Sequence, residues 1–571
     1  MKQMIPCRPI PPCLCVVAVV FSLSCTTAWS RRPIAIDGEF DDWSGVAANG
    51  NAKFTNDADR LYIYVHLGSE IWYQEDDVIE LYFDTDTNPA TGRMVNGIGA
   101  ELSWFPGLRS GTQYSAGGSA VGTFGYTTLG MFAGPTLSST EFEFAVARST
   151  LSAASTISVV ARESGAMLNA TTAYSYQPTA NAADLDTPFE NQTGYGFRFA
   201  SYNVKGTSDR PGVISQLQAL QADIVAFQEE ADHARALDVL NDHLGAGWQV
   251  AGNADVPVLS RFNVDGSWNL DSNVAVLLDT SAVTGGKLLV INVHLPCCLN
   301  ESGRISEINT ILSFLDDVRA GSYPVATNTP FVILGDFNLV GNQNTLDLIL
   351  NGSAAPPDWD GTPLASVDPM NLRKRFNYTW RNDAADNYLP GKLDYVIVSD
   401  SVIAVENGFV LDTRLMDPGE LFTLSLSSSD SDASDHLVVV ADLVIDSDQD
   451  DMADSWELTF FSSLSPDGSA DSDNDLASDL NEYTALTDPT SASDFAMLDF
   501  LREATEGTLS WQSRKGRLYG IEQTTDLDAA WPPAQGIVRG TDAEMLVPVP
   551  LVAPRAHYRL RISLPWPHPD E

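Results

Sequence analysis

The sequence predicts a multidomain protein with an N-terminal β-region, a central α/β domain, an acidic repetitive segment and a small C-terminal β-domain. The chain has 571 residues, more than a single hydrophobic core ordinarily serves. Near Tyr195, short alternating or apolar runs give way to a regular alternation of strand-like and helix-like segments. From Asp446 the chain becomes acidic and repeats a pattern of aspartates.

Residues 1–30 have the features of a signal peptide. Lys2 and Arg8 form a basic start, and the apolar run from Leu14 to Leu23 is too short to span a bilayer. An Ala-Trp-Ser sequence then supplies small residues for cleavage. The alternative is a lipoprotein cut before Cys25, because "SLSC" is similar to a lipobox. We therefore expect a secreted, periplasmic or cell-surface protein with no transmembrane segment in the mature chain.

The mature chain is expected to be strongly acidic. Without residues 1–30 it has 30 Lys and Arg against 76 Asp and Glu, a net charge of −46. This charge argues against a protein that holds nucleic acid on a basic surface, although an enzyme can still meet phosphate through metal ions. Only Cys297 and Cys298 remain of six cysteines, so no disulfide framework is expected. The adjacent pair forms either a vicinal disulfide or two thiols.

Residues 31–190 are predicted to form a β-sandwich. "RLYIYVHLG" and "VIELYFDTD" alternate or run apolar, and stretches rich in Gly, Ser and Thr separate further short strands. Together with "IDGEFDDWSGV" and "LYFDTDTNPATG", they resemble family 9 carbohydrate-binding modules. The resemblance implies attachment to a glycan or a cell surface.

Two groups of side chains in this region have alternative roles. Trp72 and Trp104 either stack on sugar rings or belong to the core. Asp84, Asp86 and Asn88 either bind calcium or form a turn.

Residues 196–445 are predicted to alternate strands and helices. Helices are expected at Val213–Leu220, at Ala234–Leu244 and along the apolar face from Ile305 to Leu315. The predicted strands are "GFRFASYNV", "DIVAFQE", "NVAVLLD", "KLLVINVHL", "PFVILGDFN", "KLDYVIVS" and "HLVVVADLVI". The polar loop "SLSSSDSDASD" before His436 is expected to be mobile and close to any site built there.

Polar side chains lie at the ends of several of these strands. They are Asn203, Glu229, His294, Asp336, Asn338, Asp435 and His436. Oxygen ligands at this density suit Mg²⁺, Mn²⁺ or Ca²⁺ better than zinc. A divalent ion stabilises the negative charge of in-line attack on phosphorus. A histidine beside carboxylates is suited to proton transfer or to donating to a phosphate.

Six blocks occur in an order that resembles the endonuclease/exonuclease/phosphatase superfamily, which includes DNase I-like nucleases. They are "SYNV", "DIVAFQE", "NVHL", "GDFN", "KLDYVIVS" and "SDH". The resemblance implies a four-layer α/β/β/α sandwich with the site at one edge of two packed sheets. It also implies Mg²⁺ or Mn²⁺ as the catalytic cofactor.

The same resemblance implies the metal ligands and one histidine pair. Glu229 would be the principal metal ligand, assisted by Asn203. Asp435 would lie near the same ion or a second one. His436 would be the active-site histidine, held and polarised by Asp394 in "KLDY".

The resemblance implies further roles around the reacting phosphate. Asp336 would position or deprotonate the attacking water, and Asn338 would orient Asp336 and the phosphate. His294 would donate to a non-bridging phosphoryl oxygen. Arg261, in "VLSRFNV", and Arg304 would reach the substrate or form surface salt bridges.

Residues 446–490 contain two acidic repeats, "DSDQDDMADSWE" and "DSDNDLASDLNE". Acidic residues occupy positions 1, 3, 5, 9 and 12 of both: Asp446, Asp448, Asp450, Asp454 and Glu457, then Asp471, Asp473, Asp475, Asp479 and Glu482. This is calcium-loop spacing with a bidentate Glu at the end, although Asp451 and Leu476 replace the EF-hand glycine. The repeats resemble thrombospondin-type-3-like or dockerin-like segments, which implies structural Ca²⁺. The alternative is an acidic solvated linker.

Residues 497–565 are predicted to be a small β-domain for packing or attachment. Taken together, the sequence predicts a secreted divalent-metal-dependent phosphodiesterase, above all a nuclease acting on extracellular DNA or RNA. One alternative is a phospholipid or small phosphate-ester hydrolase of the same fold, although no apolar membrane-docking hairpin occurs in the sequence. Another is a surface glycan-binding protein with an inactive central domain, which the complete set of site residues disfavours. The oligomeric state is left open.

Overall fold

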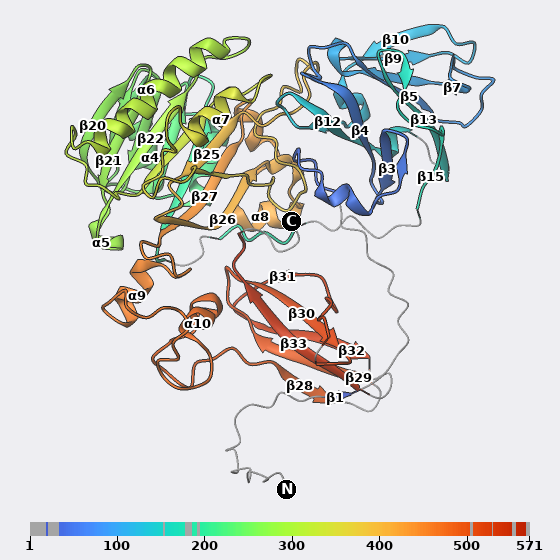
Figure 1. Ribbon diagram of the computed structural model, residues 1–571. Helices are drawn as coiled ribbons and strands as arrows, with labels where there is room; N and C mark the ends of the chain where they lie inside the picture. The colour runs from blue at the N-terminus through green and yellow to red at the C-terminus, as the bar shows by residue number, and fades with distance from the viewer. Residues whose placement is uncertain are drawn as a thin grey trace. The chain divides into compact units, whose positions relative to one another are not determined.

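The computed structural model describes residues 19–20, 34–151, 155–177, 185–190, 194–502, 506–527, 529–550 and 555–566 (Figure 1). The predicted signal peptide, with Cys25, lies outside the described residues except for the backbone of 19–20. The chain divides into two units. One comprises Ser30–Leu464 and the other Ser465–Pro565, with short terminal pieces assigned to each.

The N-terminal region consists of two antiparallel sheets. One, in the order β11-β12-β4-β3-β2, contains β2 (Ala48–Asn49), β3 (Ala52–Asn56), β4 (Arg60–Ile71), β11 (Phe132–Gly134) and β12 (Ser139–Ala147). The other, in the order β10-β9-β8-β5-β13-β14 with β15 beside β13, contains β5 (Ile79–Asp84), β8 (Leu102–Phe105), β9 (Ser110–Tyr114), β10 (Ala120–Phe124), β13 (Thr156–Glu163), β14 (Ala166–Met167) and β15 (Ala173–Ser175). Short elements accompany them: η1 (Asp41–Gly45), β6 (Arg93–Val95), β7 (Ile98–Ala100), η2 (Pro106–Leu108), α1 (Tyr126–Leu129) and α2 (Arg148–Leu151).

Alternation along β4 explains how these sheets pack. Leu61 and Ile63 enter one core with Leu81 and Phe83 of the opposite sheet. Trp104 is fully buried in the same core, so it packs inside the domain and cannot stack on a sugar.

The central region contains two six-stranded sheets. The first, in the order β18-β19-β17-β16-β27-β26, contains β16 (Phe197–Asn203), β17 (Ile224–Gln228), β18 (Gln249–Asn253), β19 (Val256–Ser260), β26 (Ile403–Leu411) and β27 (Val438–Ile445). The second, in the order β20-β21-β22-β23-β25-β24, contains β20 (Asn263–Leu270), β21 (Asn273–Asp279), β22 (Lys287–His294), β23 (Phe331–Asp336), β24 (Ala365–Val367) and β25 (Asp394–Val398).

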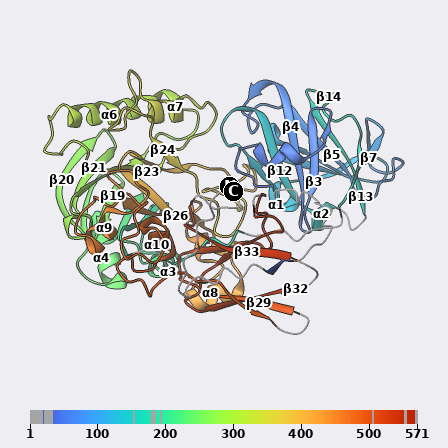
Figure 2. The ribbon, with the colours of Figure 1, turned by 60° about the horizontal axis from the view of Figure 1, so that its bottom comes forward.

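Helices cover the outer faces of these sheets. The central helices are α3 (Pro211–Leu220), α4 (His233–Leu244), α5 (Ser281–Thr284), α6 (Glu301–Arg319), α7 (Asn344–Asn351) and α8 (Pro418–Leu424), with η3 (Thr413–Leu415) and η4 (Asp430–Ala433). One core joins the facing sides of the two sheets, a second packs α3 and α4 on the first sheet, and a third packs α6 and α7 on the second. Figure 2 shows α6 and α7 along the outer side of β20–β24. The helices predicted from periodicity are confirmed.

The second unit contains α10 (Asp479–Ala485) and two small sheets. Their strands are β1 (Val19–Val20), β28 (Asp499–Arg502), β29 (Glu506–Gln512), β30 (Leu518–Thr524), β31 (Val538–Arg539), β32 (Glu544–Pro550) and β33 (Arg555–Ser563), in the orders β28-β29-β32 and β1-β33-β30-β31. Leu509, Trp511, Tyr519 and Ile521 share its core. The first acidic repeat continues into α9 (Asp454–Phe460), which belongs to the first unit. Within the described ranges, the helices are all too short or too polar to cross a membrane.

Candidate active site

Strand register brings predicted site residues to one end of the central sheets. β22 and β23 run parallel with His294 opposite Asp336, and antiparallel β25 places Asp394 on the other side of Asp336. In the first sheet, β16 and β17 run parallel and Asn203 lies opposite the residue before Glu229. The carboxyl ends of parallel strands share one edge, so strand-end side chains from both sheets converge there.

Asp336 is the centre of the resulting polar cluster. It is 1% exposed, and its Oδ2 accepts a hydrogen bond from Asn203 Nδ2 at 3.0 Å. The same Nδ2 donates to Glu229 Oε1 at 3.1 Å. His436 Nε2 lies 3.5 Å and His294 Nε2 lies 3.8 Å from Asp336 Oδ2. Residues more than 200 positions apart in the sequence therefore meet around one carboxylate.

Each histidine is held by a carboxylate of its own. His436 Nδ1 lies 2.8 Å from Asp394 Oδ2, as the sequence predicts. His294 Nδ1 lies 2.9 Å from Asp255 Oδ2. A carboxylate at Nδ1 fixes the ring orientation and leaves Nε2 free to act on a substrate. In both histidines, Nε2 points toward Asp336.

Asp255 is a residue that sequence reasoning missed. It lies in the turn between β18 and β19, and no strand-end motif marks it. Only the pairing of β19 with β17 brings this turn beside the end of β17, and so near His294. No local pattern distinguishes Asp255 from an ordinary turn aspartate.

The buried charges alter one another's pKa values. Burial raises the pKa of Asp336 to about 6. Burial lowers the pKa of His436, but Asp394 and Asp336 outweigh this effect and raise it to about 10. The pKa of His294 is also raised, because hydrogen bonding to Asp255 and the charge of Asp336 outweigh its burial. Without a bound ion, both imidazoles thus favour the protonated form that donates to an anion.

Asn338 and Asp435 lie beside this cluster in different ways. The backbone N–H of Asn338 donates to Asp336 Oδ1 at 2.9 Å, and its side chain donates to Leu295 O at 2.9 Å. Asn338 therefore fixes the orientation of Asp336. Asp435 Oδ2 accepts from Lys205 Nζ at 2.8 Å and is paired with this lysine on the rim.

The two arginines predicted to reach the substrate do not lie where they can do so. Arg261 stacks 4.6 Å above Trp248 and follows Ser260, which pairs with the first residue of β17, at the end opposite Glu229. Arg304 is 2% exposed and donates to the carbonyls of residues 296, 298 and 340 at 3.1, 2.9 and 3.3 Å. It ties two loops together. Both predictions are wrong because exposure and register are not visible in the sequence.

The donor set fits a divalent cation. One oxygen or nitrogen from each of Asp336, Asp394 and His436 lies within 4.8 Å of the others. Among the described residues, no lysine or arginine forms an ion pair with Glu229, Asp336 or Asp394. The two histidines are the cationic partners of Asp336 and Asp394, whereas Glu229 has none among these residues, and a metal ion beside it can supply the missing charge. Hard carboxylate oxygens suit Mg²⁺ or Mn²⁺.

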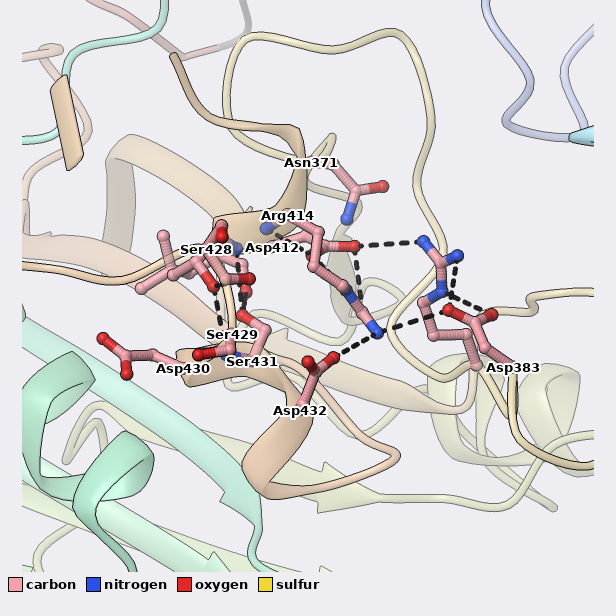
Figure 3. Close-up of polar contacts among 12 residues, drawn as sticks. Asn371, Asp383, Asp412, Arg414, Ser428, Ser429, Asp430, Ser431 and Asp432 are labelled. Carbon is pink, nitrogen blue, oxygen red and sulfur yellow. Dashed lines mark hydrogen bonds and ion pairs between the residues drawn. The ribbon is translucent and has the colours of Figure 1, made fainter. Parts of the chain in front are cut away.

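Part of the polar loop before His436 is tied to its neighbours by hydrogen bonds. Ser431 of η4 is fully buried and exchanges hydrogen bonds with Thr413, donating from N at 3.0 Å and accepting at Oγ from N at 2.9 Å. Figure 3 shows Arg414 reaching Asp432 of the same loop, at 3.4 Å. Ser431 is thus bonded to η3 and β26, whereas Ser427, Ser428 and Ser429 of the same loop are exposed.

The N-terminal sheets contact the segment that supports this loop. The hydroxyl of Tyr126 donates to Asp383, and Asp383 pairs with Arg381 at 2.7 Å. The backbone N–H of Arg381 donates to the carbonyl of Asp435 at 2.9 Å. A continuous set of contacts therefore leads from the N-terminal domain to the residue beside His436.

An open cleft of about 710 Å³ lies against the cluster. It is lined by Gly206, Glu229, Ala231, Asp232, Arg235, Asp255 and His294. The loop after β22 lies nearby and carries Cys297 and Cys298, which are exposed free thiols and not a disulfide. The cleft opens one side of the cluster, at Glu229 and His294, to a substrate.

Comparison with known proteins gives one family and several similar structures. Residues 200–436 match the model of the Endonuclease/Exonuclease/phosphatase family. A search of curated proteins gives no match. The human Nocturnin catalytic domain with bound sulfate anion is 18% identical, with 45% of this chain and 96% of that chain covered and a TM-score of 0.30.

Two further similar structures come from other organisms. D. rerio TDP2 complexed with single strand DNA product is 14% identical, with 43% of this chain and 98% of that chain covered and a TM-score of 0.30. A beta toxin from Staphylococcus aureus is 14% identical, with 43% and 99% covered and a TM-score of 0.29.

Proposed function

We propose, from the premise that residues 200–436 form a hydrolase domain of the endonuclease/exonuclease/phosphatase family, that the protein is a divalent-metal-dependent nuclease. The substrate is extracellular DNA or RNA. One observation carries this proposal: Asp336 lies between two histidines, each held by its own carboxylate, next to Glu229. This arrangement serves the hydrolysis of a phosphodiester at a metal ion.

The chemistry divides among the side chains by their position. Glu229, with Asn203, would hold Mg²⁺ or Mn²⁺, which when bound neutralises charge on the phosphoryl oxygens. Asp336, fixed by Asn338, accepts a proton from the attacking water.

The two histidines act on the phosphate itself. His436 and His294 donate from Nε2 to non-bridging oxygens and stabilise the charge that develops in the transition state. Asp394 and Asp255 keep the two rings protonated and oriented for this role.

One assay on the purified full-length chain tests the proposal. The substrates are single- and double-stranded DNA, RNA, sphingomyelin vesicles and a nitrophenyl phosphate monoester, each with Mg²⁺, with Mn²⁺ and with EDTA. We expect cleavage of nucleic acid that EDTA abolishes. Faster turnover of the lipid or of the monoester would replace nucleic acid as the substrate class. Cleavage that persists in EDTA would remove the metal from the mechanism.

We also propose that the acidic repeats bind structural Ca²⁺. The repeats contain three groups of acidic residues, and within each group one carboxylate oxygen per residue lies within 4.8 Å of the others. The groups are Asp446, Asp448 and Asp454; Asp448, Asp450 and Glu457; and Asp471, Asp473 and Asp475. Glu457 is fully buried, and both of its carboxylate oxygens lack a hydrogen-bond partner among the described residues. Glu482, at the same position of the second repeat, is 1% exposed with Oε2 likewise unpartnered. Buried carboxylate oxygens without donors support a cation at each loop, because burial without a partner is costly.

Secretion and surface attachment are further proposals. Secretion rests on the basic and apolar pattern of residues 1–30. Attachment to a glycan or a cell surface rests on the motif resemblance of the N-terminal domain. Fractionation of cells that express the full chain, with N-terminal sequencing of the product, tests the first. Binding of the catalytically inactive protein to immobilised polysaccharides tests the second.

A further inference from the structure

Arg235 is the one lysine or arginine among the described residues that line the cleft. It lies in the first turn of α4, and 32% of its side chain is exposed. The other charged groups of the lining are the carboxylates Glu229, Asp232 and Asp255, together with His294. The chain has a net charge of −44, so a positive side chain in this acidic cleft stands out as a candidate for binding an anion.

Glu230 holds the guanidinium of Arg235 in a fixed orientation. Glu230 follows the end of β17 at Gln228, beyond the left-handed backbone of Glu229 (φ 57°), and it is fully buried. Its carboxylate accepts from Nη2 of Arg235 and from Nε at 3.3 Å. It also accepts from the backbone N–H groups of Ser208 and Asp232, at 2.7 and 3.0 Å. The arginine is thus preorganised by a carboxylate that is itself rigid.

The Nη1 group of Arg235 is left for a ligand. Nη2 also donates to the carbonyl of Gly206 at 3.3 Å, so Nε and Nη2 are both used. The structure gives Nη1 no hydrogen bond within its described part, and Asp232 Oδ2 lies 3.9 Å away. Apart from this long ion pair with the exposed Asp232, the two N–H groups of Nη1 are available to bind an anion in the cleft.

This anion is not the phosphate that reacts. Asp336, His294 and His436 serve that phosphate. Within the described part of the chain, Arg235 contacts Glu230, Asp232 and Gly206 and none of these three residues.

We propose that Arg235 binds a second phosphate of the substrate, next to the phosphate that is cleaved. The inference rests on the proposed nuclease function and deepens it. The substrate is then a strand with successive phosphates, and an ester with a single phosphate lacks half of the recognition. Arginine suits this role because its planar fork matches phosphate oxygens.

Comparison of two substrates separates this role from a merely structural one. One is bis(p-nitrophenyl) phosphate, which has a single phosphate, and the other is a single-stranded oligonucleotide. Arg235→Ala is expected to raise KM for the oligonucleotide by roughly tenfold or more, the usual size of a lost charge-assisted hydrogen bond. Its kcat and KM on the single-phosphate ester are expected to stay unchanged. Arg261→Ala removes the same charge at the remote end of β19. We expect it to leave kcat and KM unchanged on both substrates.

Salt dependence gives a second readout. One phosphate contact fewer lowers the slope of log affinity against log salt by about 0.7 on single strands. If Arg235→Ala does not fold, Arg235→Lys keeps the charge and loses the fork. The wild type also tests the inference without a variant, because a trinucleotide with two phosphates is expected to bind more tightly than a dinucleotide with one.

Several results would overturn the inference. They are equal losses on both substrates, an unchanged KM for the oligonucleotide in Arg235→Ala, or equal affinity of the wild type for the di- and trinucleotide. If the wild type cleaves neither substrate with Mg²⁺ or Mn²⁺, the proposed function itself fails. If it cleaves both and Arg235 does not distinguish them, the proposed function stands and this inference falls.

Discussion

His294 and His436 approach the same oxygen, Asp336 Oδ2, through their Nε2 atoms at 3.8 and 3.5 Å. They come from different sheets of the central domain and are held from behind by Asp255 and Asp394. A phosphate bound beside Asp336 would therefore meet a donor from each sheet. The relationship makes both histidine–carboxylate pairs testable in parallel.

The first prediction concerns these carboxylates. Asp394→Asn keeps the size of the side chain but removes the charge that keeps the His436 ring protonated and oriented. We expect kcat to fall by about 10²- to 10³-fold, the usual cost of losing one donor to the charge that develops in the transition state. Steady-state kinetics on an oligonucleotide measures the fall, and Asp255→Asn is the matched variant for His294. Wild-type turnover by both, in folded proteins, would show that the pairs take no part in catalysis.

The second prediction concerns the catalytic metal. Glu229 carries no hydrogen bond except that from Asn203 Nδ2 within the described part of the chain. Glu229→Gln removes a negative ligand, so we expect the Mg²⁺ concentration for half-maximal activity to rise by at least about tenfold. Titration of activity with Mg²⁺ after treatment with EDTA measures this. Glu70→Gln, at an exposed position on β4 of the N-terminal domain, is the control with the same charge change.

The third prediction concerns pH and the first acidic repeat. Burial, with the charges of Asp450 and Asp448, raises the pKa of Glu457 to about 8 from its ordinary 4.5. Between these values the folded protein binds more protons at Glu457 than the unfolded chain does, so folding loses stability as pH rises. In EDTA, Tm is therefore expected to fall between about pH 5 and pH 8.

Calcium and a matched pair of variants check the pH prediction. Saturating Ca²⁺ neutralises the repeat, so we expect it to remove the fall in Tm. Glu457→Gln should flatten the pH dependence in EDTA, whereas Asp451→Asn, exposed in the same loop, should not. Equal pH profiles for wild type and Glu457→Gln in EDTA would contradict the assignment. Differential scanning calorimetry supplies all four curves.

The fourth prediction concerns the contact between the N-terminal sheets and the active-site loop. Tyr126→Phe removes the hydrogen bond to Asp383, and we expect the free energy of unfolding to fall by about 1 kcal/mol. Because Asp383 supports Arg381 and the carbonyl of Asp435, kcat should fall as well. Tyr82→Phe is the control, since its hydroxyl donates to Glu80 at 2.9 Å within the N-terminal domain. A loss of stability in both variants with kcat unchanged would limit the contact to a structural role.

The strand-end residues of the site were predictable because a parallel sheet places the ends of its strands together. His294 and Asp336 followed apolar runs, and their chemistry was visible before their register was known. Asp255 and Arg235 follow no such run. One lies in a turn and the other in the first turn of a helix, and only tertiary packing brings them to the cleft.

The wrong predictions have a different physical cause. Arg304 has a guanidinium group of the kind that binds phosphate, but this group donates to loop carbonyls in the interior. The loop before His436 is rich in serine and aspartate, which is typical of exposed segments, yet Ser431 within it is fully buried and exchanges two hydrogen bonds with Thr413. Polarity in a sequence does not distinguish a hydrogen bond to water from one to protein.

One strand, β27, lies between the proposed metal site and the first acidic repeat. His436 precedes it and Asp446 follows it, so its eight residues separate the reacting phosphate from the first acidic repeat by roughly 26 Å. If that repeat folds only around Ca²⁺, the far end of this strand has a firm anchor only where the ion is plentiful.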